Sequence, residues 1–298
     1  MILPATLITE LRTAGLDVGE VEQVVARALA EDLAGGVDVT SVATVPFDQE
    51  SVVDFVARAP GVVAGLPVAS VVLLAATEAA VQVDAHVADG ARVEAGTVLL
   101  TAAGFTRTLL TAERTALNLL CHLSGVATLT RSWVDAIAGS GAAIRDTRKT
   151  TPGLRALEKY AVRCGGGVNH RLSLADAALI KDNHVAAAGG VGPAYRAVRA
   201  AFPELPVEVE CDTVQQVREA VGAGADLVLL DNMTVDAIRA SVDLVRASGR
   251  RCQLEASGGI TLGTAADIAA TGVDFLAIGA LTHSASVLDI GADLRALL

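Results

Sequence analysis

Basic residues gather in one stretch of this chain, between Arg145 and Lys181. The stretch holds eight of the 23 lysines and arginines, where an even spread would give about three, together with His170 and a triple glycine at 165–167. Guanidinium groups pair bidentately with carboxylates and phosphates, and glycine lets backbone amides approach an anion closely. The stretch therefore predicts a pocket for a substrate with several negative charges. The charges alone also allow a solvated basic face.

A second group of chemically useful residues stands at the ends of short apolar runs. From Glu210 onward these runs recur at intervals that fit one strand, one helix and two loops, which predicts successive βα units of a parallel sheet. Catalytic groups of a parallel barrel cluster where its strands end. Lys181, Asp231 and Glu255 stand at such ends, together with Glu208 or Glu210, which share a strand face. Acids inside a barrel require a cation, a metal or substrate hydroxyls, so an ion pair with lysine is the purely structural alternative. The six runs are residues 142–146, 177–182, 207–211, 226–231, 252–257 and 274–279.

Glycine turns follow the last two runs, as SGGIT at 257–261 and GALTHS at 279–284. Backbone N–H groups in such turns, with a helix N-terminus behind them, suit a phosphate monoester. The glycines at 222–226 resemble a nucleotide-binding loop but precede a strand, whereas that loop follows one. They predict the end of a helix instead.

Composition narrows the class of protein. The chain has 298 residues, 52% hydrophobic but only 3% aromatic, so small aliphatic side chains must fill the core, as in α/β proteins. A net charge of −11 argues against nucleic acid as a general partner. This net charge does not prevent anion binding, because charges more than about 8 Å away are largely screened. The charge of the local pocket then determines whether an anion binds.

Cellular location follows from the cysteines and the apolar runs. The four cysteines stand far apart without a CxxC pair, which predicts a reducing compartment and neither a disulfide framework nor a zinc site. The start lacks a signal-peptide pattern, and the most apolar run, 61–76, is too short to span a membrane. We therefore expect a cytoplasmic protein.

The N-terminal third of the sequence predicts a different arrangement of helices and strands. Asp17 is placed to cap a helix over 17–33, and alternating residues predict strands at 51–58 and 80–87. A long helical pattern starts at Thr111, and Ser124-Gly125 is expected to loosen it midway. We place the domain boundary just before this helix, giving an N-terminal domain of residues 1–112 and a second domain of residues 113–284.

Several long motifs, in order, carry a family resemblance. They are ERTALNLLCHLSGVAT, DTRKTTPGLRALEKYAVRCGGGVNHR, LIKDNH, VEVEC, LLDN, LEASGGI and GALTHS. Together they closely resemble nicotinate-nucleotide diphosphorylase (carboxylating), the quinolinate phosphoribosyltransferase family, from about position 31 to the C-terminus. The resemblance implies an N-terminal α/β sandwich, an irregular (β/α) barrel of about seven strands, a homodimer, and a segment 285–298 that returns to the first domain.

The implied reaction joins quinolinate to 5-phosphoribosyl-1-diphosphate with Mg²⁺ as cofactor. It gives nicotinate mononucleotide, diphosphate and CO₂, a step of NAD biosynthesis. The resemblance assigns the quinolinate carboxylates to Arg148, His170 and Arg171. Arg114 would reach the same pocket from the partner subunit, and Lys181 would lie at the junction of the two substrates.

The remaining implied residues serve the phosphoribosyl group. Lys149 would bind at the same junction, while Glu210 and Asp231 would take the ribose hydroxyls and Mg²⁺. Catalysis would therefore rest on Lys149, Lys181, Glu210 and Asp231. The 5-phosphate would be bound by Ser257, Gly258 and Gly279, with help from His283.

Three other functions deserve comparison. A nicotinate phosphoribosyltransferase without decarboxylation would bind only one carboxylate, whereas the density of cations here favours two. A metal-transport-associated homologue of the same fold is the second alternative. A non-catalytic binder of phosphorylated metabolites is the third, but it would have no use for Glu210 and Asp231 beside a cationic pocket.

Overall fold

A computed structural model describes residues 3–77 and 81–296. The first residue of the expected strand 80–87 and the last two of the returning segment lie outside these ranges. The chain forms two compact units, one of residues 1–131, 150–166 and 282–298, the other of residues 132–149 and 167–281.

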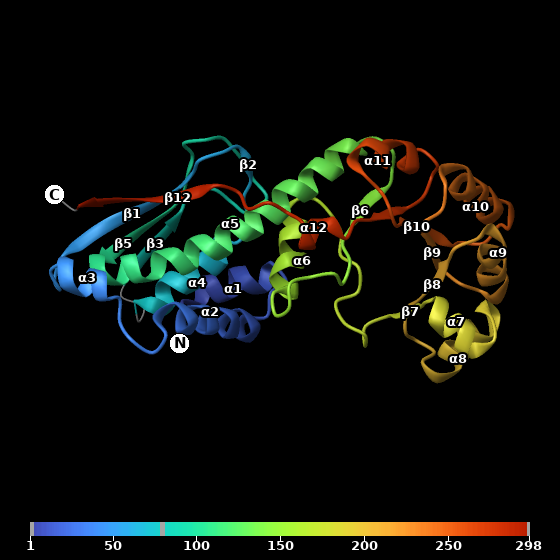
Figure 1. Ribbon diagram of the computed structural model, residues 1–298, viewed down its shortest axis with the longest axis horizontal. Coiled ribbons are helices and arrows are strands. Elements are labelled where there is room, and N and C mark those ends of the chain that lie inside the picture. The colour runs from blue at the N-terminus through green and yellow to red at the C-terminus, as the bar shows by residue number, and fades with distance from the viewer. Residues whose placement is uncertain (1–2, 78–80, 297–298) are drawn as a thin grey trace. The chain divides into compact units, whose positions relative to one another are not determined.

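The first unit is built on a four-stranded antiparallel sheet in the order β12-β1-β5-β3 (Figure 1). β12 pairs with β1, so the C-terminal segment supplies an edge strand. The strands are β1 (Glu50–Ala57), β3 (Val81–Ala85), β5 (Val98–Phe105) and β12 (Ile290–Ala296), with a small β2 (Gly61–Val62) and β4 (Arg92–Val93) pair. The helices of its first third are α1 (Ala5–Thr13), α2 (Val18–Leu33), α3 (Val39–Thr44) and α4 (Leu66–Ala76).

Local sequence signals set these elements. Asp17 accepts a hydrogen bond from the Glu20 N–H at 2.9 Å and starts α2, which confirms the helix predicted over 17–33. The apolar stripe of α2 is buried. The strand predicted at 51–58 is β1, and the apolar run at 61–76 holds the buried helix α4.

One helix, α5, runs without a break from Thr106 to Ala136. The expected loosening at Ser124-Gly125 is therefore wrong. Ser124 instead hydrogen-bonds the backbone of Ala64, and a Cβ on Gly125 would overlap the carbonyl of Ser286. The glycine is needed for close approach of two backbones. A helix can carry such a residue when tertiary contacts outweigh its low propensity.

α5 also explains why the first unit extends beyond the expected boundary at residue 112. Thr128 and Ser124 hydrogen-bond the chain at 62–64, which ties the helix to the first unit. α6 (Arg155–Cys164) joins the same unit, where Tyr160 donates to Asp89 at 2.6 Å. Both connections are between distant parts of the sequence and leave no local pattern.

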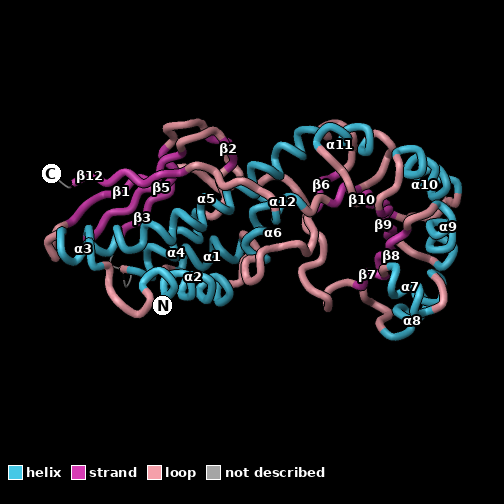
Figure 2. The backbone as a smooth tube through the Cα atoms, viewed as in Figure 1, coloured by secondary structure: helices cyan, strands magenta, loops and turns pink. Residues whose placement is uncertain are grey.

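The second unit contains a six-stranded parallel sheet in the order β6-β11-β10-β9-β8-β7. Its strands follow an arc with helices on the outer side (Figure 2). All six predicted runs form strands, and a parallel bridge between Arg145 and Val168 adds one further pairing beside β6. The expectation was about seven strands, and the described sheet has six strands and one additional bridge. The strands are β6 (Ala143–Arg145), β7 (Ala178–Ile180), β8 (Val207–Cys211), β9 (Leu227–Asp231), β10 (Gln253–Ser257) and β11 (Phe275–Ala277).

Helices follow most of these strands, as βα units require. Thr213 and Gln216 form a capping box at the start of α9, and Gly224 ends it with a left-handed backbone, φ +103°. The glycines at 222–226 are therefore a helix C-cap, as predicted. The helices of the region from β7 onward are α7 (Asp182–Ala188), α8 (Val191–Ala201), α9 (Val214–Ala223), α10 (Val235–Ala247), α11 (Leu262–Ala269) and α12 (Ala280–His283).

Two predictions about the chain as a whole can be compared with the structure. Cys121, Cys164, Cys211 and Cys252 are all free thiols. Within the described ranges, none of the helices combines the length and the apolar character needed to cross a membrane.

Candidate active site

A cavity of about 630 Å³ opens at the carboxyl ends of the parallel strands in the second unit. This is the edge of a parallel sheet where catalytic groups gather. Nine of the twelve predicted site residues line it: Arg148, Lys149, His170, Arg171, Lys181, Glu210, Asp231, Ser257 and Gly258. The fold thus brings together residues that are more than 100 positions apart in sequence.

Three predicted residues do not line this cavity. Arg114 and His283 belong to the first unit, and Gly279 follows β11 in the second. Their roles stay predictions. The basic stretch itself divides, because Arg155, Lys159 and Arg163 belong to α6 of the first unit. Only part of the stretch therefore forms the pocket.

Two guanidinium groups line this cavity, and the charge of one acts on the other. Burial, and then the neighbouring charge of Arg148, lower the pKa of Arg171, while Glu208 and Asp176 oppose that shift. The Nε of Arg148 is buried without a hydrogen-bond partner. Like charges held together, with a donor unpaired, are unfavourable until an anion binds between them.

Acids line the same cavity at the ends of neighbouring strands. Glu210 ends its face of β8 and accepts from the Lys181 ammonium at 2.6 Å, with Lys181 48% exposed. Asp231 ends β9 and accepts from the Asn232 side chain at 2.7 Å. The ion pair that formed the structural alternative is therefore present. Exposed pairs contribute little to stability, so this one can open for a substrate.

A glycine turn follows β10 at the cavity wall. Gly258 and Gly259 both have left-handed backbones, with φ of +87° and +62°. α11 starts just after them, behind Thr261. Backbone N–H groups at a helix start suit a phosphate, which agrees with the predicted cradle. Asn232, itself at φ +53°, lies directly against Gly258, where a Cβ would overlap its side chain.

The floor of the cavity is a buried charged network. The Nε2 of His170 lies 2.7 Å from Glu208 and 3.7 Å from Glu255. Arg145 pairs with Glu255 at 2.7 Å. Asp146, fully buried, accepts the backbone N–H of His170 at 2.7 Å. The network fixes the floor from three strands and the loop between them.

His170 has little left to offer a substrate in this arrangement. Its Nδ1 accepts the backbone N–H of Arg171 at 2.7 Å, and its Nε2 faces Glu208. Both ring nitrogens are thus engaged within the protein. The predicted contact between His170 and a quinolinate carboxylate would require one of them to be released, and it stays a prediction.

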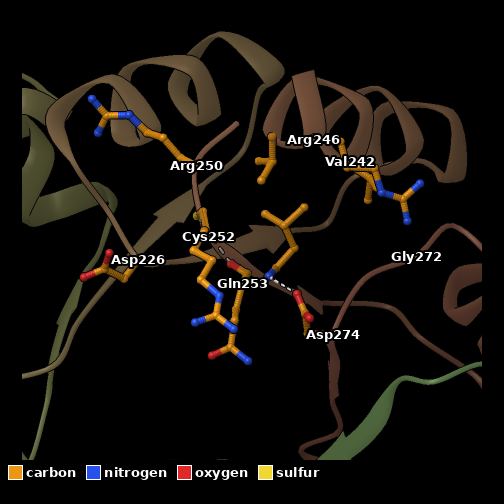
Figure 3. A pocket seen from close by; sticks show the side chains of 11 residues that line it. Asp226, Val242, Arg246, Arg250, Cys252, Gln253, Gly272 and Asp274 are labelled. Atoms are coloured by element: carbon orange, nitrogen blue, oxygen red, sulfur yellow. Dashed lines mark hydrogen bonds between the residues drawn. The ribbon is translucent and has the colours of Figure 1, made fainter. Parts of the chain in front are cut away.

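A second cavity, of about 690 Å³, lies at the opposite ends of the strands (Figure 3). Arg246 and Arg250 line it but point away from each other. Asp274 there accepts the backbone N–H of Leu254 at 2.7 Å, a structural role. Arg246 and Arg250 do not converge there.

Family models match most of the chain. The N-terminal domain of quinolinate phosphoribosyl transferase matches residues 38–124, and its C-terminal domain matches residues 126–293.

This chain belongs to the quinolinate phosphoribosyl transferase family.

Individual relatives agree with the family assignment. The chain is 55% identical over 273 residues to nicotinate-nucleotide pyrophosphorylase [carboxylating] of Mycobacterium leprae, covering 90% of this chain and 95% of that protein. It is 42% identical to the probable enzyme of the same name in Bacillus subtilis, covering 88% and 89%. The crystal structure of NadC from Streptococcus pyogenes matches with a TM-score of 0.90 at 38% identity, covering 95% and 99%.

Two groups of residues in this structure can be compared with the ligands that a divalent metal requires. Glu210 and Asp231 offer carboxylate oxygens in the open cavity, the ligand type that Mg²⁺ prefers. His170, Glu208 and Glu255 also lie close enough to share an ion, within 4.8 Å. However, Nδ1 of His170 accepts an N–H, so its proton is on Nε2 and this nitrogen has no lone pair for a metal. The first pair fits Mg²⁺ and the second group does not.

Sequence reasoning missed Asn232, and it placed Glu255 at a strand end without giving it a role. Asn232 stands in the LLDN motif and links Asp231 to the glycine turn. Its signal was the motif itself, because an Asn after a strand tolerates a left-handed backbone. Glu255 was visible as a strand-end acid, but its partners were not.

The glycine turn gives one testable prediction. Gly258→Ala combines a left-handed backbone with an overlap onto Asn232, so we expect affinity for phosphoribosyl diphosphate to fall at least about tenfold. Quinolinate affinity should stay unchanged, and calorimetry measures both. Gly141→Ala is the matched control, since Gly141 has φ +86° and open space around it. Equal losses in the two variants would mean that backbone strain alone is responsible.

Proposed function

We propose that this chain transfers the phosphoribosyl group of 5-phosphoribosyl-1-diphosphate to quinolinate with loss of one carboxylate. The products are nicotinate mononucleotide, diphosphate and CO₂. The observation that carries the proposal is the Arg148–Arg171 pair, with its unpartnered buried Nε, in the same cavity as the glycine turn. The names of the relatives support the same reaction.

The number of cations favours a diacid over a monoacid. Opposite charges 4 Å apart attract by roughly 4 kcal/mol at an effective dielectric of about 20. Arg148, Arg171 and Lys181 line the cavity, so two carboxylates can each meet a cation. A single carboxylate, as in nicotinate, would leave the two guanidinium groups less well neutralised. Quinolinate is therefore the better fit.

Transfer of the ribose group uses the acids. Departure of diphosphate builds positive charge on the ribose ring, as in glycoside cleavage. Glu210 and Asp231 would stabilise that charge and orient the ribose hydroxyls. They would also hold Mg²⁺, which when bound offsets negative charge on the leaving diphosphate. Lys149 would bind at the junction of the substrates.

Loss of CO₂ follows from the product of that transfer. Once the pyridine nitrogen bears the ribose, the ring carries a positive charge next to the departing carboxylate. The electrons left behind are stabilised by this charge, so we infer neither a covalent intermediate with the protein nor a redox cofactor.

The reaction itself is the first test. Purified protein with quinolinate, phosphoribosyl diphosphate and Mg²⁺ should release CO₂ and form nicotinate mononucleotide in equal amounts. Nicotinate in place of quinolinate should give no comparable turnover. Turnover of nicotinate without CO₂ would favour the non-decarboxylating transferase, and binding without any turnover would favour the non-catalytic binder.

The assembly proposal is a homodimer in which Arg114 completes the site of the neighbouring subunit. Arg114→Ala and Lys181→Ala would then remove residues that act in one site but come from different chains. Mixed heterodimers should regain up to about one quarter to one half of wild-type activity, because one of their two sites is intact. Activity is measured after mixing and re-association. No recovery would show that each site is built from one chain.

Location within the cell is proposed from the thiols. Four free cysteines accord with a reducing compartment, and we propose the cytoplasm.

A further inference from the structure

Two acids lie beneath the candidate active site without an assigned task. Glu255 is fully buried on β10, and Glu208 is nearly so on β8. Each has one oxygen, Oε1, that is buried without a hydrogen-bond partner. Unpartnered buried carboxylate oxygens are costly, so this pair calls for an explanation beyond stability. Glu255 lines the cavity together with the residues proposed to bind substrate.

Charged groups from two other strands and one loop face Glu255. Arg145 on β6 pairs with its Oε2 at 2.7 Å, and His170 faces its Oε1 at 3.7 Å. Glu208 faces it from β8, while the directly adjacent strands present Leu229 and Phe275. Two carboxylates and one arginine therefore share a nearly dry space.

The imidazole lies closer to Glu208 than to Glu255. Its Nε2 is 2.7 Å from Glu208 and 3.7 Å from Glu255, while its Nδ1 accepts the Arg171 N–H. Arg145 is the guanidinium that hydrogen-bonds to Glu255 in the described network. Two negative charges this close are unfavourable, so one acid holds a proton.

Glu255 is the acid that holds it. Burial, and then the charge of Glu208, raise the pKa of Glu255 to about 7, against the opposing effects of His170 and Arg145. Its unpartnered Oε1 is free to bear the hydrogen. Below about pH 7 Glu255 therefore mainly holds a proton, and of the two acids it is the one that lines the cavity.

The proposed reaction needs such a group. When a carboxylate leaves the pyridine ring as CO₂, the ring carbon must gain a proton, and basic side chains that hold the diacid do not readily give one up. We propose that Glu255 is a further catalytic residue, the acid that protonates the ring carbon from which CO₂ has departed. This inference rests on the proposed function.

The step balances without any co-reactant. The bond between the ring carbon and the carboxylate carbon breaks, CO₂ leaves, and the electron pair stays on the ring carbon. The proton of Glu255 moves to that carbon and forms the C–H bond. Glu255 becomes a carboxylate, which Arg145 stabilises, and it regains a proton from water before the next turnover.

Glu255→Gln tests the assignment, because it keeps shape but removes the acidic proton. The rate of nicotinate mononucleotide formation in a single turnover should fall about 100-fold, within the range for a general acid. Quinolinate affinity should change less than about threefold, and Glu255→Asp should restore part of the rate. The wild-type rate should fall as pH rises through about 7, where Glu255 loses its proton, and the Gln variant should lack this dependence.

Glu158→Gln is the matched control, since Glu158 is a fully buried acid paired with His122 at 2.9 Å in the other unit. An equal loss of rate in both variants would overturn the proposal, as would an unchanged rate in Glu255→Gln. If Glu255→Gln does not fold, the wild-type protein decides: a flat rate between pH 6 and 8 would overturn the proposal. Absence of any CO₂ release by the wild-type protein would instead reject the proposed function.

Discussion

Replacing Arg148 by alanine is expected to weaken quinolinate binding by about 100-fold. Arg148 lines the cavity with a buried, unpartnered Nε, and a hydrogen bond to a charged group contributes about 1.5–3 kcal/mol. Arg148→Lys keeps the charge but loses the planar fork, so it should lose about tenfold. Calorimetric titration with quinolinate measures both variants.

The control for this experiment is an arginine of the same unit outside the cavity. Arg239 is 55% exposed on α10 and pairs only weakly with Asp236, so Arg239→Ala should bind quinolinate like the wild-type protein. Unchanged binding in Arg148→Ala would remove Arg148 from the site. A loss in both variants would point to the overall charge of the protein instead.

Asp231→Asn is expected to lower kcat by about 100- to 1,000-fold. The variant keeps the shape of the side chain but loses the negative charge that would face the developing positive charge on the ribose and hold Mg²⁺. Quinolinate affinity should be unchanged, since the diacid is bound by the cations. Steady-state rates at several Mg²⁺ concentrations measure the effect, and the variant should need more Mg²⁺.

Asp236→Asn is its control, because Asp236 is 94% exposed on α10 and five positions away. That variant should keep the wild-type kcat. A kcat for Asp231→Asn within about threefold of the wild type would mean that Asp231 acts neither on the ribose nor on the metal.

The parallel sheet was predictable because its signals are local. Each strand is a short apolar run that ends in a polar residue, and from Glu210 onward the spacing of the runs predicts one helix between successive strands. Strand ends of parallel units meet at one edge, so Lys181, Glu210 and Asp231 could be placed together before their contacts were known. No contact between distant parts of the chain has to be known for this prediction.

The extent of the first unit was not predictable in this way. The sequence of α5 suggests the start of a new domain, because its long helical pattern follows a region of strands. Its assignment depends on hydrogen bonds from Ser124 and Thr128 to residues 62–64. Gly125 packs closely against the backbone of Ser286, whereas its propensity alone suggested a weak point. Tertiary contacts outweighed local preference in both cases.

The cavity floor was hidden for a related reason. Glu208 and Glu255 lie on β8 and β10 with β9 between them, and His170 lies on a loop. Alternation along each strand shows that a side chain faces inward but not which side chain it meets. The choice between a substrate ligand and a buried network for His170 therefore required the structure.

A crystal structure with quinolinate bound tests the central claim most directly. Both carboxylates should lie in the cavity of the second unit, with Arg148 and Arg171 at about 3 Å from their oxygens. Quinolinate bound elsewhere, for example between Arg246 and Arg250 at the opposite ends of the strands, would contradict the account.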